Sequence, residues 1–595
     1  MNIVEIIPWG TVETTIAQRF EQVAEQLPDQ IAIEFGDQKM TYSELNAQAN
    51  HVAHTILNEV DEKEARISFF LEHGLSQIIA LLGTIKACKP YVALDTHFPA
   101  ERNQYMLKDS GSRLLVTNSL NLSQARALAG DIKLLNIDEI DKEGRSGNPT
   151  RDRDPDSMVF IMYTSGSTGE PKGVIHTNRG IVHYIKRFSE AIGTNTSDRI
   201  AFYYSISFSA HTMPILTALL NGATLMIYDL RKDNLSEFAK WLRSQKVTAT
   251  LMIPSTLRHF QAVLNQNFKM PAMRQLWIGG ETLYRSDVDK IRKHLKKHSI
   301  VINLYASSEA FFSRYYTMDQ DTVIKTNIVP IGYYVEDMDI DIVDEELKRV
   351  DPNQVGEILI KSPYLATGYL NKPDQTSEDF IFEEETGIIK FRSKDLGYKQ
   401  SDGCIVHIGR SDSMVKVRGY RVDLGEIENN LLQHKNLKEA SVQLKENPYG
   451  TKHIVAYVVA KDDSSIDFEY LKMGILRMLP EYMVPSYFVQ LKSLPRNEIG
   501  KLDKKAIPDP DWNRFDKDKV IIQPKNAIEY ELQEIFQRIL EVQPISMDDN
   551  ILDLGADSLR LFVAFDEIEK KYGKKLNIDS FVENPTLTHL AKVMS

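Results

Sequence analysis

The chain has 595 residues, 42% of them hydrophobic, and a formal net charge of -12. This length predicts several buried cores, and the acidic balance argues against nonspecific binding to nucleic acids or anionic membranes, which depends on a positive surface field. Cys88 and Cys404 are the only cysteines, and no stretch has the length of a membrane span or the features of a secretory signal, so we expect a cytoplasmic location without a disulfide framework.

Short β-branched apolar runs alternate with helical patterns from about residue 30 to 310. The runs include IAIEF, YVALD, MVFIMY, TATLMIP and QLWIGG. This alternation predicts an α/β fold in which helices cover parallel sheets. Between Leu235 and Leu242, apolar residues recur at helical spacing, as expected of a covering helix. Ligand sites in such folds lie where strands end in loops.

The rest of the chain divides into four further parts. Residues 355–408 are rich in strand patterns and predict a mostly β subdomain, and a mixed strand and helix pattern after residue 412 predicts a smaller α/β domain. Residues 507–525 contain three prolines and many charges, which is typical of a linker. The last 70 residues predict a small helical bundle with 13 acidic and 7 basic residues, a net charge of -6.

A loop suited to polyphosphate follows the strand pattern MVFIMY. It runs from Thr164 to Gly173 as TSGSTGEPKG. Glycines let the backbone approach a phosphate closely, hydroxyls and amides donate hydrogen bonds, and Lys172 adds positive charge. The spacing differs from that of the P-loop NTPases, because no Ser or Thr follows the lysine.

Several motifs in order resemble the adenylate-forming superfamily of acyl-CoA synthetases and luciferases, and specifically the adenylation domains of nonribosomal peptide synthetases. Besides the phosphate loop they include MTYSELN at 40, NLYASSEA at 303, FRSKDLG at 391, GRSDSMVKVRGYRVDLGEIE at 409 and NEIGKLDKKA at 497. The tail separately resembles a peptidyl or acyl carrier domain. The resemblance implies a large adenylation subdomain at 1–410, a small mobile subdomain at 411–508, a linker at 509–525 and a carrier domain at 526–595.

The resemblance also implies roles for individual residues. Tyr305 would stack on adenine, Asp395 would bind the ribose hydroxyls, and Lys501 would bridge the substrate carboxylate and the α-phosphate. Asp412 would be the hinge about which the small subdomain turns between two half-reactions, after which the segment of Lys416 faces the site. The implied catalytic residues are Lys501, Lys172 and Glu309, with Glu309 also holding Mg²⁺. The implied ATP-binding residues are Thr164, Ser165, Gly166, Ser167, Thr168, Gly169, Gly280, Tyr305, Ser308, Asp395 and Arg410.

Ser558 lies in the motif LGADSL, just before an amphipathic helical pattern. By itself the serine would be read as a helix N-cap. The carrier resemblance instead implies that a phosphopantetheinyl transferase attaches a 4'-phosphopantetheine arm there. The sequence GADSL resembles fatty-acid and polyketide carriers somewhat more than typical peptidyl carriers, which suggests a mixed pathway.

The resemblance further implies a substrate pocket without charge. Its positions are Phe208, Ser209, Ala210, Met213, Leu251, Trp277, Gly279, Leu304, Phe312 and Ser313. Adenylation domains for α-amino acids place an aspartate where Ser209 stands. Because a buried ammonium without a carboxylate is costly, we expect a hydroxy, keto, aryl, aliphatic or β-amino acid. Two further departures from the family pattern are Ala306-Ser307-Ser308 before Glu309, and Ser393-Lys394 before Asp395.

These observations predict an ATP-dependent ligase that forms an acyl-adenylate of a small carboxylic acid and transfers the acyl group to its own carrier. It would act as a loading or stand-alone module and pass its product to a condensation or ketosynthase-type enzyme. Its cofactors would be ATP, Mg²⁺ and 4'-phosphopantetheine. Alternatives are an acyl-CoA synthetase with an incidental tail, an α-amino-acid module with an atypical pocket, and a noncatalytic scaffold. Retention of Lys501, Glu309 and Asp395 speaks against the scaffold.

Overall fold

The computed structural model describes residues 6–10, 13–60, 62–141, 144–165, 170–411, 414–417, 420–447, 452–462, 465–496, 504, 506–512, 521–540, 542–552, 554, 556, 558–574, 576, 581 and 584–594. At positions 421, 558, 559 and 562 it describes the backbone alone. The secondary structure given below refers to this part of the chain.

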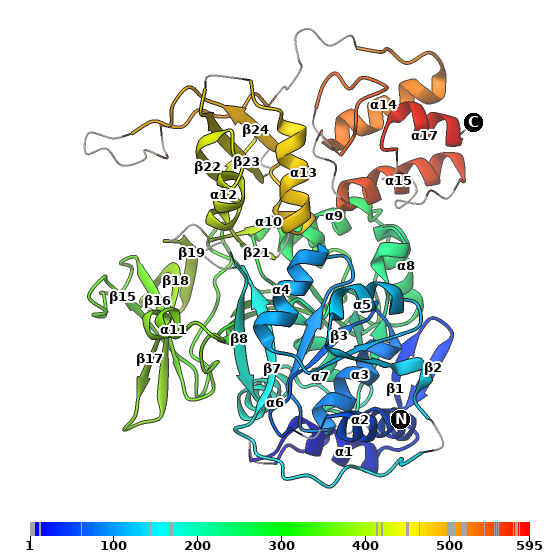
Figure 1. The fold of residues 1–595 in the computed structure, drawn as a ribbon, viewed down its shortest axis with the longest axis vertical. Helices are drawn as coiled ribbons and strands as arrows, with labels where there is room; N and C mark the ends of the chain where they lie inside the picture. Colours follow the sequence, from blue (N-terminus) through cyan, green and yellow to red (C-terminus); the bar gives the residue numbers. More distant parts are fainter. Residues whose placement is uncertain are drawn as a thin grey trace.

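Two sheets form the large N-terminal part of the protein, drawn in blue to green in Figure 1. The first sheet has the strand order β14-β13-β12-β11-β9-β10-β1-β2. Its inner pairs are parallel, and the edge strands β2 and β14 are antiparallel to their neighbours. The strands are β1 Ile31–Phe35, β2 Gln38–Thr41, β9 Arg199–Phe202, β10 Thr224–Ile227, β11 Ala249–Met252, β12 Gln275–Gly279, β13 Ile300–Ser307 and β14 Phe311–Met318.

The second sheet has the order β6-β5-β3-β4-β7-β8. It is parallel except for β8, which forms an antiparallel hairpin with β7 around the phosphate-loop motif. Its strands are β3 Ile67–Phe70, β4 Tyr91–Leu94, β5 Leu114–Thr117, β6 Lys133–Asn136, β7 Met158–Thr164 and β8 Lys172–Thr177.

Helices separate and cover the two sheets. One apolar core joins facing residues of both sheets to the helices between them, which are α1 Ile16–Gln26, α2 Tyr42–Glu59, α3 Leu75–Lys86, α6 Asn178–Ile192 and α7 Thr212–Leu219. A second core packs α8 Leu235–Ser244, α9 Pro254–Val263 and α10 Arg285–Arg292 on the outer face of the first sheet. A third packs α4 Ala100–Ser110 and α5 Leu122–Ala129 on the second sheet. The result is a five-layer arrangement, because each apolar sheet face needs a covering helix layer.

A β subdomain follows. It contains the strands β15 Asp339–Val343, β16 Gly356–Ser362, β17 Phe380–Glu383, β18 Ile388–Lys399 and β19 Ile405–Arg410, with helix α11 Pro373–Asp379. The strands are all antiparallel, and they bury their own apolar core against Tyr305 of β13. The β subdomain is therefore attached to the end of the first sheet.

The small subdomain begins with a hairpin and continues as a three-stranded sheet with two helices. Its elements are β20 Met414–Val417, β21 Tyr420–Asp423, α12 Leu424–Leu432, β22 Leu437–Glu446, β23 Lys452–Ala460, α13 Phe468–Met478 and β24 Tyr487–Gln490. Three short 3₁₀ helices lie in the large part, at Ile137–Glu139, Ser209–His211 and Leu230–Lys232. A fourth, Glu481–Met483, lies in the small subdomain.

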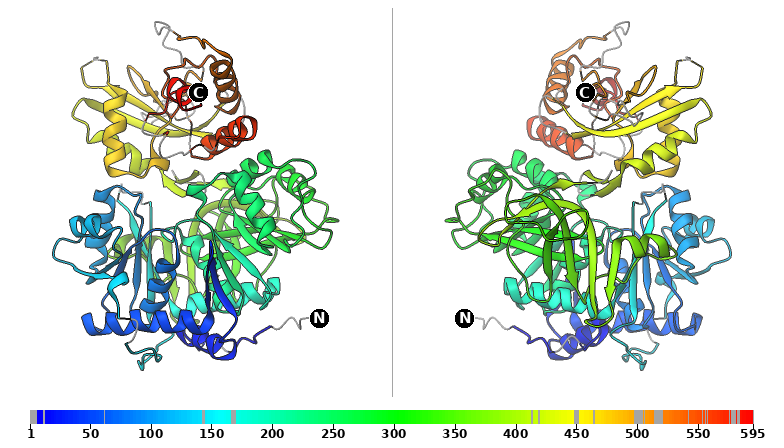
Figure 2. Two further views of the ribbon diagram at one scale, coloured as in Figure 1. Left: turned by 90° about the vertical axis from the view of Figure 1, so that its right-hand side faces the viewer. Right: turned by 90° about the vertical axis from the view of Figure 1, so that its left-hand side faces the viewer.

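The tail forms a bundle with its own apolar core. Its helices are α14 Ala527–Leu540, α15 Ser558–Tyr572 and α17 Leu587–Met594. Helix α15 lies against α8 and α9 of the large part, and Figures 1 and 2 show the bundle above these helices. The predicted fold class is confirmed: parallel sheets with helices, a β subdomain, a small α/β subdomain and a helical tail. The domain boundaries themselves stay predictions.

Gly83 is required by the close contact between α2 and α3. A Cβ at this position would lie 2.6 Å from the Cβ of Val52 and 2.9 Å from the carbonyl oxygen of Ala49. Gly83→Ala is expected to destabilise the large part by about 1–3 kcal/mol, because the two helices must separate. The measurement is chemical denaturation of the purified chain.

Gly474 provides the matched control, because it is also a helical glycine. A Cβ there would meet nothing within 4 Å. Gly474→Ala should stabilise α13 by about 0.5–1 kcal/mol through the lower flexibility of alanine in the unfolded chain. An unchanged unfolding free energy in Gly83→Ala would contradict the role given to the α2 and α3 contact.

Candidate functional site

A cavity of about 640 Å³ lies at the carboxyl ends of β12 and β13. Sites of parallel sheets are expected at this edge. The walls come from every part of the protein. The large part supplies Gly280, Asn303, Leu304 and Tyr305, the β subdomain Asp395, His407 and Arg410, the small subdomain Val415, Lys416 and His453, and the tail bundle Arg560.

Asp395 is the buried acidic group of this cavity, with 3% of its surface exposed. The hydroxyl of Tyr305 donates to Oδ2 at 2.6 Å, and Nη1 of Arg410 donates to Oδ1 at 2.5 Å. Burial raises the pKa of Asp395, but the hydrogen bond from His407 and the charges of Arg410 and Lys416 outweigh burial and hold the pKa well below its usual value. Asp395 is therefore an ionised acceptor, as ribose hydroxyls would require.

Lys172 and Glu309 form a second buried group. Nζ of Lys172 lies 3.4 Å from Oε1 of Glu309, and their side chains are 9% and 0% exposed. Thr164 is paired with Lys172 across the β7 and β8 hairpin, and Ser165 is 2% exposed. The hairpin thus places the two ends of the predicted phosphate loop beside the Glu309 carboxylate.

Tyr369 joins this second group, and nothing in the sequence motifs pointed to it. Its hydroxyl lies 3.0 Å from Oε1 of Glu309 and 3.0 Å from Oδ2 of Asp379. The Lys172 ammonium lies 3.9 Å from the centre of the Tyr369 ring. Tyr369 and Asp379 lie outside every quoted motif, so only their spatial position could reveal them.

The donor set fits Mg²⁺ bound together with polyphosphate. A buried carboxylate oxygen of Glu309 is the hard ligand that Mg²⁺ prefers, and Lys172 would pair with phosphate oxygens. Among the described residues, no group of three or more His, Cys, Asp or Glu side chains could hold a metal by itself. This agrees with an ion that takes its remaining ligands from phosphates and water.

Several predicted residues lie outside the described part of the chain: Gly166, Ser167, Thr168, Gly169, Asp412 and Lys501. Ser558 opens helix α15, but the structure describes only its backbone. Their roles therefore stay predictions. Gly280 lines the cavity, whereas Ser308 is not among the lining residues and donates a hydrogen bond to Ser209 at 3.2 Å.

Comparison with known proteins agrees with this geometry. The family model described as AMP-binding enzyme matches residues 20–370, and that of the AMP-binding enzyme C-terminal domain matches residues 426–501. This chain belongs to the AMP-binding enzyme family. A further model, the phosphopantetheine attachment site, matches residues 531–594. The matches indicate ATP, Mg²⁺ and 4'-phosphopantetheine as cofactors and confirm the family resemblance seen in the sequence.

The curated relatives are peptide synthetases. Bacitracin synthase 2 of Bacillus licheniformis is 32% identical over 98% of this chain and 22% of its own length. Tyrocidine synthase 1 of Brevibacillus parabrevis is 30% identical over 98% of this chain and 53% of its own length. The chain therefore spans about a fifth to a half of these two relatives.

Solved structures share the fold. A protein containing adenylation and PCP domains, holo-PA1221 bound to a vinylsulfonamide inhibitor, matches with a TM-score of 0.82 and 21% identity, over 98% of this chain and 97% of that chain. An artificially fused adenylation-PCP di-domain from Klebsiella oxytoca matches with a TM-score of 0.72 and 23% identity, over 82% of this chain and 95% of that chain. At these identities the likeness concerns the fold.

The small subdomain of this AMP-binding enzyme presents its β20 and β21 hairpin to the cavity. Met414, Val415, Lys416 and Val417 line it. Lys416 therefore faces the cavity, whereas the turn of the small subdomain about Asp412 stays a prediction.

A buried ion pair holds the small subdomain against the large part. Nη1 of Arg102 on α4 lies 3.0 Å from Oε1 of Glu426 on α12, with side chains 4% and 1% exposed. Burial raises the pKa of Glu426, and Arg102 and a hydrogen bond from Ser165 partly oppose this effect. The contact therefore places α12 beside one end of the predicted phosphate loop.

The tail bundle contacts the large part through polar groups on α15. Nδ2 of Asn234 donates to Oε2 of Glu569 at 3.2 Å. The pKa of Lys240 on α8 is raised chiefly by its hydrogen bond to Glu237, and the charges of Asp566 and Glu569 add to this effect. Arg560, two residues after Ser558, is 6% exposed and lines the cavity. The first turn of α15 is thus directed at the site.

The predicted substrate-pocket residues are brought together around the ends of β11, β12 and β13. Leu251 is paired with Trp277, and Gly279 with Leu304. Phe188 packs against Trp277 and Phe312 at ring distances of 5.1 Å and 4.9 Å. The buried positions are Met213, Leu251, Trp277, Gly279, Leu304, Phe312 and Ser313, whereas Phe208, Ser209 and Ala210 are partly exposed.

Arg187 is a charged neighbour of this pocket that sequence reasoning missed. Its guanidinium lies 5.4 Å from the Phe312 ring centre and donates to the Phe312 carbonyl oxygen. Burial lowers the pKa of Arg187 to about 10. This partly buried charge next to the predicted pocket is positive, which adds to the cost of placing an ammonium there.

Membrane insertion finds no support in the described helices. None of those helices combines the length and the apolar content needed to cross a bilayer.

The hydroxyl of Tyr305 can be tested separately from its ring. Tyr305→Phe keeps the aromatic face but removes the hydrogen bond to Asp395, which is worth about 1 kcal/mol. The KM for ATP should rise roughly 5-fold, because 1.4 kcal/mol is tenfold. Steady-state kinetics of adenylate formation would measure it. Tyr316→Phe, on the neighbouring strand β14, should leave KM unchanged, and an equal rise in both variants would contradict the assignment.

Proposed function

We propose that this AMP-binding enzyme activates a small carboxylic acid with ATP as an acyl-adenylate and then transfers the acyl group to a 4'-phosphopantetheine arm on Ser558. One observation carries the proposal: Tyr305 and Asp395, Lys416 of the small subdomain and Arg560 of the tail bundle line a single cavity. The predicted nucleotide-binding residues and the predicted carrier thus line the same cavity.

Binding and orientation by this chain would account for the first half-reaction. Asp395 accepts the ribose hydroxyls, the Tyr305 ring offers a face to adenine, and Lys172 with Glu309 lies where the polyphosphate and its metal would bind. Lys501 would enter the site from the small subdomain and offset the charge that builds when a carboxylate attacks the α-phosphate. Two anions react in this step, so cations rather than a general base are needed.

Rearrangement of the small subdomain would account for the second half-reaction. The hinge at Asp412 removes Lys501 and brings the β20 and β21 hairpin to the cavity. In that arrangement Lys416 faces Asp395, and Arg560 in the first turn of α15 forms part of the cavity wall. The arm on Ser558 would then enter the cavity beside Arg560 and reach the adenylate, shielded from water.

The substrate is proposed to lack an α-ammonium group. Ser308 donates a hydrogen bond to Ser209, and the partly buried Arg187 beside Phe312 is positively charged. The aromatic packing of Phe188, Trp277 and Phe312 favours a short acid over a long one. Hydroxy, keto, aryl, short aliphatic and β-amino acids remain the substrate classes to test.

The partners follow from the carrier domain. A phosphopantetheinyl transferase would load Ser558, and a condensation or ketosynthase-type enzyme would receive the acyl group. Helix α15, with Asp566 and Glu569 toward α8, would present its other faces to these partners.

Ser558→Ala separates activation from loading. Exchange of pyrophosphate into ATP should continue at the wild-type rate, while mass spectrometry should find no acyl group on the protein. Arg560→Glu should retain exchange and the arm but slow self-loading at least tenfold, because it places a negative charge in the cavity near Asp395. Lys574→Glu on the same bundle is the control. Covalent acyl groups on Ser558→Ala, or free acyl-CoA as the product, would contradict the proposal.

A panel of size-matched acids tests the substrate class. Acids with an α-hydroxyl, α-keto or α-methyl group should support pyrophosphate exchange, and the corresponding α-amino acids should be at least 100-fold poorer, in keeping with about 3 kcal/mol for an unpaired buried charge. Ser209→Asp should reverse this order in favour of α-amino acids. Best exchange with an α-amino acid by the unmodified enzyme would refute this substrate class and leave the ligase reaction standing.

A further inference from the structure

Lys394 has a backbone conformation that lysine rarely adopts. Its φ is +59°, in the left-handed region that favours glycine, and it directly precedes Asp395 in β18. The backbone is held on both sides: its N–H donates to Oε1 of Glu357 at 3.1 Å, and its carbonyl oxygen accepts from the N–H of Ser411 at 2.9 Å. A glycine would fit this backbone better, so the lysine side chain calls for an explanation.

The Lys394 ammonium is directed at two acidic residues at the end of α11. Nζ lies 2.9 Å from Oδ1 of Asp379 and 3.2 Å from Oε1 of Glu378. Burial lowers the pKa of Lys394, but its hydrogen bonds and the charges of Asp379 and Glu378 outweigh burial and leave the pKa above its usual value. The ammonium is therefore a fixed positive charge beside Asp379.

Asp379 connects this charge to the predicted metal site. It is 7% exposed, and its Oδ2 lies 3.0 Å from the hydroxyl of Tyr369 and 3.9 Å from Nζ of Lys172. The same Tyr369 hydroxyl lies 3.0 Å from Oε1 of Glu309. One hydroxyl thus stands between two carboxylates, and its single proton cannot satisfy both fully. Cations on either side are needed to keep two carboxylates this close.

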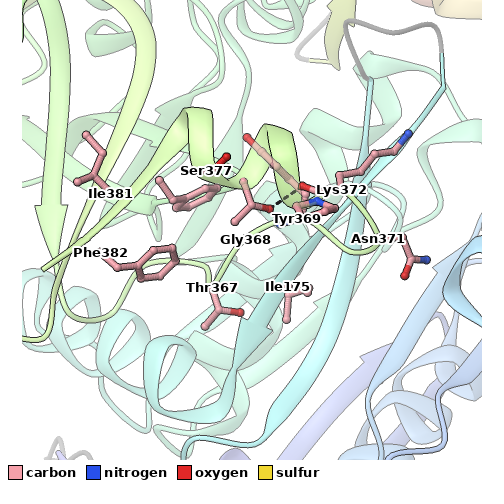
Figure 3. Close-up of a pocket in the computed structure, with 12 residues that line it drawn as sticks. Ile175, Thr367, Gly368, Tyr369, Asn371, Lys372, Ser377, Ile381 and Phe382 are labelled. Atoms are coloured by element: carbon pink, nitrogen blue, oxygen red, sulfur yellow. Dashed lines mark hydrogen bonds between the residues drawn. The ribbon is translucent and has the colours of Figure 1, made fainter. Parts of the chain in front are cut away.

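The backbone of Tyr369 is fixed against the strand that carries Lys172. Its N–H donates to Oγ1 of Thr376 at 3.0 Å, and the next residue, Leu370, donates to the carbonyl oxygen of Gly173 at 2.8 Å. Figure 3 shows this loop in the wall of a surface pocket of about 570 Å³, with Gly368 and Tyr369 labelled. Tyr369 can therefore transmit the position of Asp379 to Glu309 with little freedom of its own.

We propose that Lys394 and Asp379 are positioning residues, which hold Glu309 through Tyr369 in the orientation that a metal-bound polyphosphate requires. Lys394 neutralises Asp379, so that the Tyr369 hydroxyl is shared with Glu309 and Lys172 stays between the two carboxylates. Without the Lys394 charge, Asp379 would draw Lys172 and the Tyr369 hydroxyl away from Glu309. This inference rests on the proposed function, because it concerns the same phosphate site.

A purely structural ion pair is the competing explanation. It would stabilise the contact between β18 and α11 without influence on the metal. The two explanations differ in one respect, since only the positioning role predicts a change that depends on Mg²⁺ and on the β- and γ-phosphates.

Calorimetric nucleotide binding to the full chain distinguishes them. The probes are a non-hydrolysable ATP analogue with Mg²⁺, the same analogue with EDTA, and AMP. Lys394→Met and Asp379→Asn should weaken binding of the analogue with Mg²⁺ about tenfold, whereas binding with EDTA and binding of AMP should stay within about twofold. Lys394→Arg should restore the affinity, because it returns the charge. The Mg²⁺ concentration for half-maximal pyrophosphate exchange should rise in parallel.

Lys390→Met is the matched control, since Lys390 lies on the same strand and pairs with Glu383 away from the cavity. The double variant Lys394→Met with Asp379→Asn should lose less than the sum of the two single changes, because the unpaired carboxylate is also removed. Equal weakening of all three probes, or unchanged binding of the analogue with Mg²⁺ in a folded Lys394→Met, would overturn the inference. Absence of exchange with every acid would refute the proposed function, while the binding measurements would still decide this point.

Discussion

The Asp395 carboxylate is the contact on which the rest of the site depends. It is buried in the β subdomain, yet its nearest donors include Tyr305 at the end of the first sheet and Arg410 at the end of β19. A carboxylate removed from water requires such donors, so its burial fixes the β subdomain against the sheet. The nucleotide-binding wall and the start of the small subdomain are therefore positioned by one charge.

Charged and polar side chains also make the other contacts described between the parts of the chain. Arg102 and Glu426 join the large part to the small subdomain. Both side chains are buried, so loss of either partner would leave an unpaired buried charge, which is costly. The tail bundle, in contrast, contacts α8 through a hydrogen bond between Glu569 and Asn234, which is 7% exposed. The small subdomain is thus joined to the large part by a buried ion pair, whereas this contact of the carrier is a hydrogen bond from a neutral amide to a carboxylate.

Sequence patterns were sufficient for the fold class and for residues inside motifs. Runs such as IAIEF and QLWIGG became strands of the first sheet, and Asp395 and Glu309 proved to be buried in the predicted region. The antiparallel edge strands β2 and β14 were not foreseen, because alternation predicts strands but not their direction at an edge. Arg187, Tyr369, Asp379 and His407 carry no local signal; each acquires its partners only through tertiary packing. The departure from the family pattern at Lys394 was visible in the sequence, but its partner Asp379 was not.

The contact of α15 with α8 and α9 would have a kinetic consequence for the carrier. The predicted linker 509–525 would confine the bundle to the neighbourhood of the site, at an effective local concentration in roughly the millimolar range. A docking surface with few polar contacts is sufficient at that concentration, and its low affinity permits rapid release. Tighter binding of the carrier would position the arm better but would lengthen each binding event. Turnover would then be limited by dissociation of the loaded carrier rather than by chemistry.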